Sequence, residues 1–227
     1  MSARSAPRFI FYDFLKSGMP EWEDIFEEQG RVFTKPHQDM ERVVQVFHEY
    51  HVKRVLDVGC GSGRHLVYLS KEGFETYGFD VSQVAISLAH EWLQEERLHA
   101  IIIKHQMEES FPYEDSFFDA VIAIQVIHHN RMREILLTVG EIKRVLRSGG
   151  VLFVSFPILS KVPSEGDKDW KLEQIEPGTY IPQRGPEAGI PHHYFTEDEI
   201  YRVFANFDLQ SVHIDDTGHR CVLGIKK

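Results

Sequence analysis

The sequence has few cysteines, no long hydrophobic run and no excess of basic residues. Its 227 residues include two cysteines, Cys60 and Cys221, which build no disulfide framework and favour a reducing compartment. No segment approaches the roughly 18 consecutive apolar residues that a membrane span needs. The first residues, MSARSAPRF, lack the apolar stretch of a signal peptide. These absences predict a cytoplasmic protein with no membrane partner.

The charge balance bears on the kind of partner. Acidic residues outnumber basic residues by 35 to 25, and the formal net charge is −10. Proteins that bind nucleic acid draw much of their affinity from clustered lysine and arginine, and this chain has no long basic tract. Nucleic acid is therefore a disfavoured partner, and a small-molecule substrate is expected. Nothing in the sequence sets an oligomeric state.

Predicted strands and helices alternate along the chain. Apolar segments with strand character lie at residues 53–58, 76–80, 100–104, 118–125 and 150–156. Apolar residues at helical spacing, or helix-capping signals, mark residues 20–30, 37–50, 64–72, 82–97 and 131–146. Alternation of this kind predicts a doubly wound, mostly parallel sheet with helices on both faces.

The carboxyl-terminal region predicts one more helix and a hairpin. Thr196 caps a helix that runs to about Asn206, and strands at 209–214 and 220–225 flank a turn at 215–218. So short a connection with aspartate and glycine favours an antiparallel pair. The predicted fold class is therefore α/β, a Rossmann-like sheet of seven strands that is mostly parallel and ends in this antiparallel hairpin.

A single domain of four parts is expected. Residues 1–51 supply amino-terminal helices and part of a lid, and residues 52–156 form the ligand-binding core. Residues 157–195 hold six of the ten prolines and are predicted to be a long loop over the substrate. Residues 196–227 complete the sheet with a helix and the hairpin.

Three alternating glycines follow the first predicted strand, in VLDVGCGSGRH at residues 55–65. Gly59, Gly61 and Gly63 let the backbone turn sharply and approach a ligand closely, because they carry no Cβ. The dinucleotide fingerprint G-x-G-x-x-G needs its third glycine where Arg64 stands, and the Gly-Lys-Ser/Thr ending of a P-loop is missing. The loop thus favours a ligand without phosphates that has an amino-acid end and a nucleoside end.

At these residues the chain resembles the class I S-adenosylmethionine-dependent methyltransferases, particularly the small-molecule type with a GCGSGR loop. The resemblance covers residues 52–156 strongly and 194–227 weakly, by element order. It implies S-adenosyl-L-methionine as cofactor and S-adenosyl-L-homocysteine as product. It also implies that Asp57 and Cys60 join the three glycines as cofactor contacts.

A further position of that family pattern lies at the end of the second strand. Asp80 stands where the family places an acid against both ribose hydroxyls, and Val81 follows it. Its separation from Asp57 suits two acids at adjacent strand tips. The alternative interpretation of Asp80 is a solvated acid that caps the next helix.

The third and fourth strand ends supply the remaining cofactor positions. Gln106 and Met107 stand where the family holds the adenine, although glutamine replaces the usual aspartate. An amide can still hydrogen bond the adenine edge, whereas a methionine there could equally fill the core. Ile124 and Gln125 end the fourth strand, where the family places the methionine end of the cofactor.

Histidine pairs supply the candidate general bases, because histidine titrates near neutral pH. His128 and His129 follow the fourth strand, and His193 lies in GIPHHYF at residues 189–195. Adjacent histidines point in different directions, so no metal site is expected; surface histidines are the alternative for each pair. The candidate substrate and lid residues are Tyr12, Trp22, Arg31, His192, His193 and Tyr194.

These observations predict an enzyme that transfers a methyl group in line to the O, N or S atom of a small molecule. A tRNA wobble-uridine methyltransferase and a chalcogen-oxyanion methyltransferase are alternatives within the same chemistry. A NAD-dependent oxidoreductase and a non-catalytic protein that binds S-adenosylmethionine are alternatives of another class. The oxidoreductase is disfavoured because Arg64 occupies the third glycine position.

Overall fold

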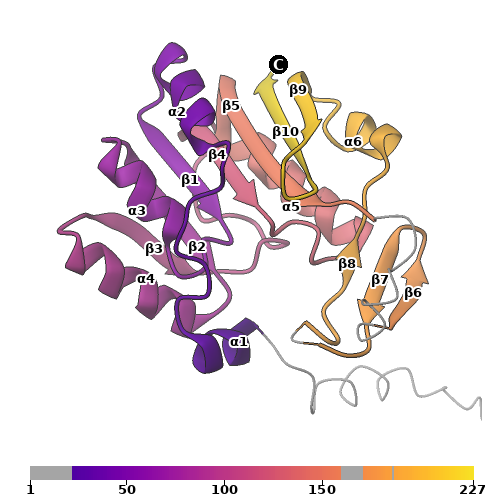
Figure 1. The fold of residues 1–227 in the computed structure, drawn as a ribbon. Helices are drawn as coiled ribbons and strands as arrows, with labels where there is room; N and C mark the ends of the chain where they lie inside the picture. Colours follow the sequence, from indigo (N-terminus) through magenta and orange to yellow (C-terminus); the bar gives the residue numbers. More distant parts are fainter. Residues whose placement is uncertain (1–21, 160–170, 186) are drawn as a thin grey trace, which may run out of the picture.

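The computed structural model describes residues 22–159, 171–185 and 187–227 (Figure 1). The helices of this part are α1 (Trp22–Gln29), α2 (Met40–Glu49), α3 (Arg64–Lys71), α4 (Gln83–Glu95), α5 (Met132–Val145) and α6 (Glu197–Val203). The main sheet contains β1 (Arg54–Val58), β2 (Glu75–Asp80), β3 (Ala100–Lys104), β4 (Phe118–Ile124), β5 (Leu146–Pro157), β9 (Phe207–Ile214) and β10 (His219–Lys226).

The main sheet confirms the predicted fold class. Its strand order is β3-β2-β1-β4-β5-β10-β9. Strands β1 to β5 pair in parallel, and β10 pairs antiparallel with both β5 and β9. The chain order reverses at β1, which lies between β2 and β4. Ligands of open α/β sheets bind at such a switch point, beyond the carboxyl ends of the strands.

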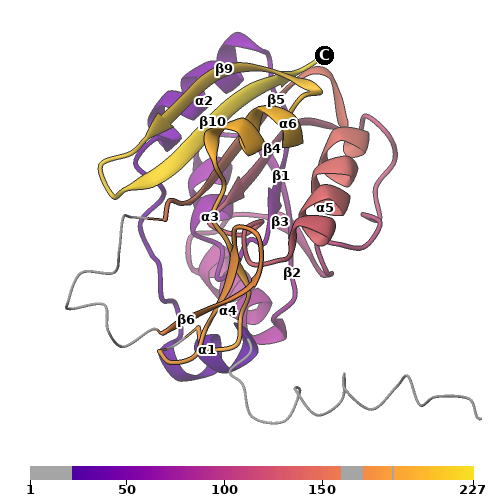
Figure 2. The same ribbon diagram turned by 90° about the vertical axis from the view of Figure 1, so that its right-hand side faces the viewer.

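Apolar layers cover the two faces of the sheet, and Figure 2 shows α5 opposite α2 and α3. On one face, Ile142 of α5 and Ile200 of α6 pack over Val121 in a single cluster. On the other face, Phe47 of α2 belongs to a cluster with Ile122. Neighbouring residues of β4 therefore face opposite cores, as the period of two in a strand requires.

A second, three-stranded sheet occupies part of the segment predicted to be a loop. It contains β6 (Leu172–Glu176), β7 (Thr179–Pro182) and β8 (His192–His193) in that order. The prediction of a long loop over 157–195 is therefore wrong where these strands lie. Pro177 and Gly178 join β6 to β7, and Gly178 has a φ of 78°, which suits the third position of a type II turn. Pro177 therefore belongs to the turn of a hairpin, whereas from the sequence it indicated only a break in regular structure.

The small sheet and α1 lie at the same end of the molecule, towards which the arrowhead of β4 points (Figure 1). This is the carboxyl edge of the parallel strands, where the glycine loop also begins. None of the helices in the described residues has the length and apolar character to cross a membrane.

Candidate functional site

The glycine loop leaves β1 and passes directly into α3, with its backbone in the left-handed region. Gly59 and Gly61 have φ values of 66° and 51°, which side chains other than glycine rarely adopt. A Cβ on Gly59 would also collide with the side chain of Val126, whereas a Cβ on Gly61 would meet only Phe26, at 3.3 Å. Packing against Val126 and the geometry of the turn therefore both require a glycine at position 59. Glycine at position 61 leaves space for a cavity beside α1.

Asp80 fastens the glycine loop to the tip of β2. One carboxylate oxygen accepts the Gly61 N–H at 2.8 Å, and the other accepts the Ser82 N–H at 2.9 Å. Burial raises the pKa of Asp80, while hydrogen bonds from Ser82, Gly61 and Val81 oppose this rise. A carboxylate has about four lone-pair positions, so acceptor capacity remains for a ligand. The helix cap is Ser82, whose hydroxyl accepts from Ala85, and Asp80 supports it.

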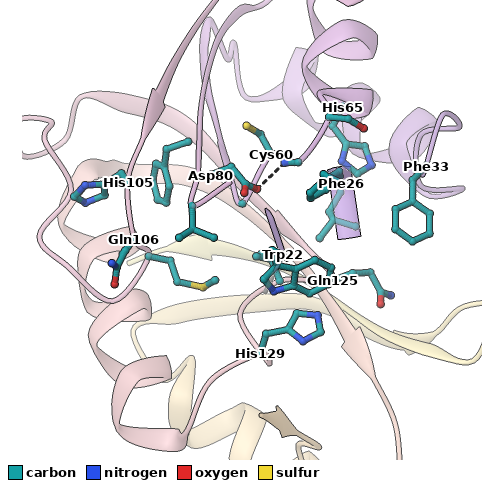
Figure 3. Close-up of a pocket in the computed structure, with 18 of the residues that line it drawn as sticks. Trp22, Phe26, Phe33, Cys60, His65, Asp80, His105, Gln106, Gln125 and His129 are labelled. Atoms are coloured by element: carbon teal, nitrogen blue, oxygen red, sulfur yellow. Dashed lines mark hydrogen bonds between the residues drawn. The ribbon is translucent and has the colours of Figure 1, made fainter. Parts of the chain in front are cut away.

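A cavity of about 250 Å³ opens between this loop, the tips of β2 and β4, and α1. Figure 3 shows Asp80 and Gln106 on one side, with Trp22 and His129 close to each other on another. Trp22 meets His129 edge to face, with 4.8 Å between the ring centroids. The predicted cofactor residues that line the cavity are Gly59, Cys60, Gly61, Asp80, Val81, Gln106, Met107, Ile124 and Gln125.

Two predicted cofactor residues lie outside the cavity lining. Gly63 precedes α3, and a Cβ there would lie 2.8 Å from Cβ of Ala89, so its place is set by packing against α4. Asp57 is buried below the loop, and its Oδ2 has no hydrogen-bond partner among the described residues. Burial raises the pKa of Asp57 to about 8, although Arg64 opposes this rise.

The predicted lid residues divide into those at the cavity and those held elsewhere. Trp22 lines the cavity. Arg31 does not, because it forms a fork with Glu95 at 2.7 and 2.9 Å and lies over the ring of Trp92. Tyr194 packs against Tyr180 instead of reaching the cavity. Tyr12 lies outside the described residues.

His193 is held in a structural position. Its side chain is fully buried, and its ring shares a hydrogen bond of 2.8 Å with Thr179. Its backbone N–H donates to the carbonyl of His128 at 2.7 Å, which fastens β8 to the loop after β4. The ring is turned from the cavity and packs against Phe195. Of the three candidate bases, only His129 lines the cavity.

His128, His129 and His192 form one wall beside the cavity. The ring centroids of His128 and His129 are 3.9 Å apart, and that of His192 is 4.7 Å from His129. Burial lowers the pKa of both His128 and His129, and the neighbouring histidines lower each further. Protonation of both rings is therefore disfavoured, and both are neutral at pH 7.

Sequence reasoning missed several lining residues, among them Phe26, His65 and Val126. Phe26 had a usable signal, since Trp22 and Phe26 stand four residues apart on one face of α1. Gln125 was expected at the site but not its backbone, which has a φ of 62°. Such a conformation in a residue other than glycine costs about 1–3 kcal/mol and persists only where the surrounding structure holds it.

A methyltransferase family and several methyltransferases match parts of this chain. The family described as "Methyltransferase domain" matches residues 56–154. An mRNA cap guanine-N(7) methyltransferase from Schizosaccharomyces pombe is 24% identical over 170 residues, which cover 64% of this chain and 46% of that protein. A ubiquinone biosynthesis O-methyltransferase from Rickettsia felis is 30% identical over 106 residues, which cover 46% of this chain and 43% of that protein.

A solved structure extends the likeness beyond the matched core. An S-adenosylmethionine-dependent methyltransferase from Clostridium acetobutylicum has a TM-score of 0.67 and 13% identity, and the match covers 89% of this chain and 96% of that one. At this identity the likeness concerns the fold. The chain spans less than half the length of the two curated relatives named above.

Proposed function

We propose that this chain is a class I S-adenosylmethionine-dependent methyltransferase that methylates the O, N or S atom of a small molecule, and the methyltransferase match over residues 56–154 supports this. One observation carries the proposal. The carboxylate of Asp80 and the backbone of the glycine loop meet at one cavity, at the carboxyl edge of the sheet. The chain bears no excess of positive charge that would favour a nucleic-acid acceptor.

The residues around the cavity fit S-adenosylmethionine. Asp80 keeps acceptor positions for the ribose hydroxyls, and Gln106 and Met107 line the cavity where an adenine would lie. Gly61 leaves the space in which a longer side chain would stand. The half of the cavity between Gly59 and Gln125 would hold the amino-acid end.

The main contribution of the chain to the reaction is to hold the two reactants in the correct relative positions. S-Adenosylmethionine, when bound, supplies a methyl group on a positively charged sulfur that leaves readily. The acceptor atom must then be held in line at about 3 Å, which is a task of binding and orientation. Trp22 and Phe26 from α1 exclude water from one side of the cavity. His129 presents a neutral imidazole in the wall, where it can accept a hydrogen bond from the acceptor.

Equilibrium binding tests the cofactor assignment. Titration calorimetry is expected to detect binding of S-adenosylmethionine and S-adenosylhomocysteine, and none of NAD, because Arg64 replaces the third glycine of the dinucleotide fingerprint. Binding of NAD alone would contradict the proposal. A screen of small hydroxyl, amine, thiol and chalcogen-oxyanion acceptors, with tRNA alongside, would then follow the release of S-adenosylhomocysteine. Release with tRNA alone would move the enzyme to the RNA class, and binding without release from any acceptor would favour a non-catalytic role.

The segment from β6 to β8 is proposed to close the acceptor side of the cavity. The ring of His192 in β8 packs against the ring of His129, which lines the cavity. A ligand that restricts the motion of His129 would therefore also restrict the motion of His192. Hydrogen exchange of the amides at residues 172–182 is expected to slow when S-adenosylhomocysteine and an acceptor bind. Protection equal to that of β1 and β4 before any ligand is added would make the segment a fixed wall.

A further inference from the structure

The fold brings a third histidine to the pair that follows β4. His128 and His129 are adjacent in sequence, and His192 comes from β8. One ring nitrogen from each of the three lies within 4.8 Å of the other two. The sequence predicted no metal site because two adjacent histidines were expected to point in different directions. The tertiary structure supplies the missing ring.

Two nitrogens of this cluster lack a hydrogen-bond partner among the described residues. Nδ1 of His128 and Nδ1 of His129 are buried, and neither has a hydrogen-bond partner within the described ranges. A buried polar atom without a partner costs about 1–3 kcal/mol, so native structures rarely retain one without a reason. Two such atoms in neighbouring rings point to an additional bound species.

His192 is held in the orientation of a metal ligand. Its Nδ1 is 2.8 Å from the carbonyl oxygen of Ile190, to which it donates. A backbone carbonyl that accepts from one ring nitrogen is a usual support behind a metal-binding histidine, and a metal ion would take the place of the proton that Nε2 shares with Glu187. The carboxylate of Glu187 lies 2.6 Å from Nε2 and adds negative charge where a cation would enter.

We propose that His128, His129 and His192 bind one divalent first-row transition-metal ion, with Zn²⁺ as the expected occupant. Three imidazoles suit zinc, and three protein ligands leave a fourth position open, as in catalytic zinc sites. His129 lines the cavity, so this position is next to the space for the acceptor. If the proposed methyl transfer holds, the ion binds a hydroxyl or thiol acceptor and lowers its pKa.

Two further triads in the described part of the chain have ligand spacing, and they share Cys221. One also contains His37 and Asp215, and the other contains Asp39 and His213; together these five residues form a second group. Nδ1 of His37 accepts the Asp39 N–H at 3.2 Å, so its Nε2 carries the proton and faces Asp215 at 3.0 Å. Nε2 of His213 is 2.9 Å from Asp39. These side chains satisfy one another, and the group therefore serves as an internal control.

Cobalt titration tests the site without knowledge of the acceptor. The full chain, without a polyhistidine tag and freed of metal with a chelator, is titrated with Co²⁺, whose visible spectrum reports its coordination. One equivalent is expected to bind, and excess Zn²⁺ should displace it. His192→Asn and His129→Asn should each weaken binding at least about tenfold, which is the scale for support residues of a metal site. His213→Asn and the exposed His90→Asn should leave it unchanged.

Two further measurements separate the possible failures. X-ray absorption of the wild-type cobalt form should show scattering from imidazole ligands and none from sulfur. This measurement uses the wild-type protein, so its result does not depend on whether a variant folds. Absence of stoichiometric binding, a sulfur ligand, or loss of binding in His213→Asn alone would overturn the inference. S-Adenosylhomocysteine affinity is measured on the same samples. If that ligand binds and cobalt does not, the metal site fails while the proposed methyl transfer stands, and the reverse result rejects the cofactor assignment alone.

Discussion

Replacing Asp80 with alanine is expected to weaken binding of S-adenosylhomocysteine by about 1.5–3 kcal/mol, or roughly 10- to 150-fold in Kd. The carboxylate already accepts two backbone N–H groups and has acceptor capacity left toward the cavity. Its loss removes charged hydrogen bonds to a ribose and also releases Gly61 from β2. Titration calorimetry measures the change in affinity.

Two companion variants separate the two effects. Asp80→Asn keeps the shape and one acceptor oxygen, so it should hold the loop better than alanine while losing the charge. Glu95→Ala removes an exposed acid that contacts Arg31 away from the cavity, and its affinity should equal that of the wild type. If Asp80→Ala bound as tightly as Glu95→Ala, Asp80 would serve only to support the loop and the cap of α4.

Replacing Asp57 with asparagine is expected to stabilise the protein at pH 8 and to have little effect near pH 4. Burial raises the pKa of Asp57 to about 8, whereas an aspartate in an unfolded chain titrates near 3.9. Between these values the unfolded chain has lost the proton that the folded chain keeps. Wild-type stability therefore falls as pH rises through this window, by up to about 1.4 kcal/mol per pH unit. Asparagine does not ionise, so the variant lacks this loss.

The measurement is the difference in Tm between variant and wild type at several pH values, because other titrating groups cancel in that difference. Asp119→Asn is the matched control with opposite sign. Burial alone would raise the pKa of Asp119. Hydrogen bonds from the backbone N–H groups of Lys53 and Arg54 and from the side chain of Arg147 outweigh this effect and lower the pKa, so replacement of Asp119 should destabilise the protein near pH 7. A Tm difference for Asp57→Asn that stayed constant from pH 4 to 8 would mean that Asp57 is ionised when buried.

Local sequence patterns were sufficient for the main sheet and the glycine loop. Each parallel strand is a short apolar run. Repeated alternation of such runs with helices commonly gives a parallel sheet covered by helices. The same reasoning located Asp80, since its place at a strand tip follows from counting along β2. Gly59 could be assigned to a turn, but its collision with Val126 could not, because the two residues belong to different strand ends.

The region between β5 and α6 was predicted less well. Prolines mark breaks in regular structure, and they do not say whether the pieces between them pair with each other. The pairing of β6 with β7 depends on the turn at Gly178, and that of β7 with β8 depends on residues far along the chain. Among the expected lid residues, Trp22 lines the cavity, whereas Arg31 does not, for a similar reason. Arg31 had a partner in Glu95, which its local sequence does not reveal.

The sequence by itself determined the α/β fold, the glycine loop and the acid at the tip of β2, because each depends on residues close together in the chain. The tertiary structure decided which side chains share the cavity wall. It turned His193 into the interior, left His129 at the cavity, and brought His192 against it. Such choices depend on contacts between distant segments, whose geometry is set by the packing of the whole domain and by no local pattern.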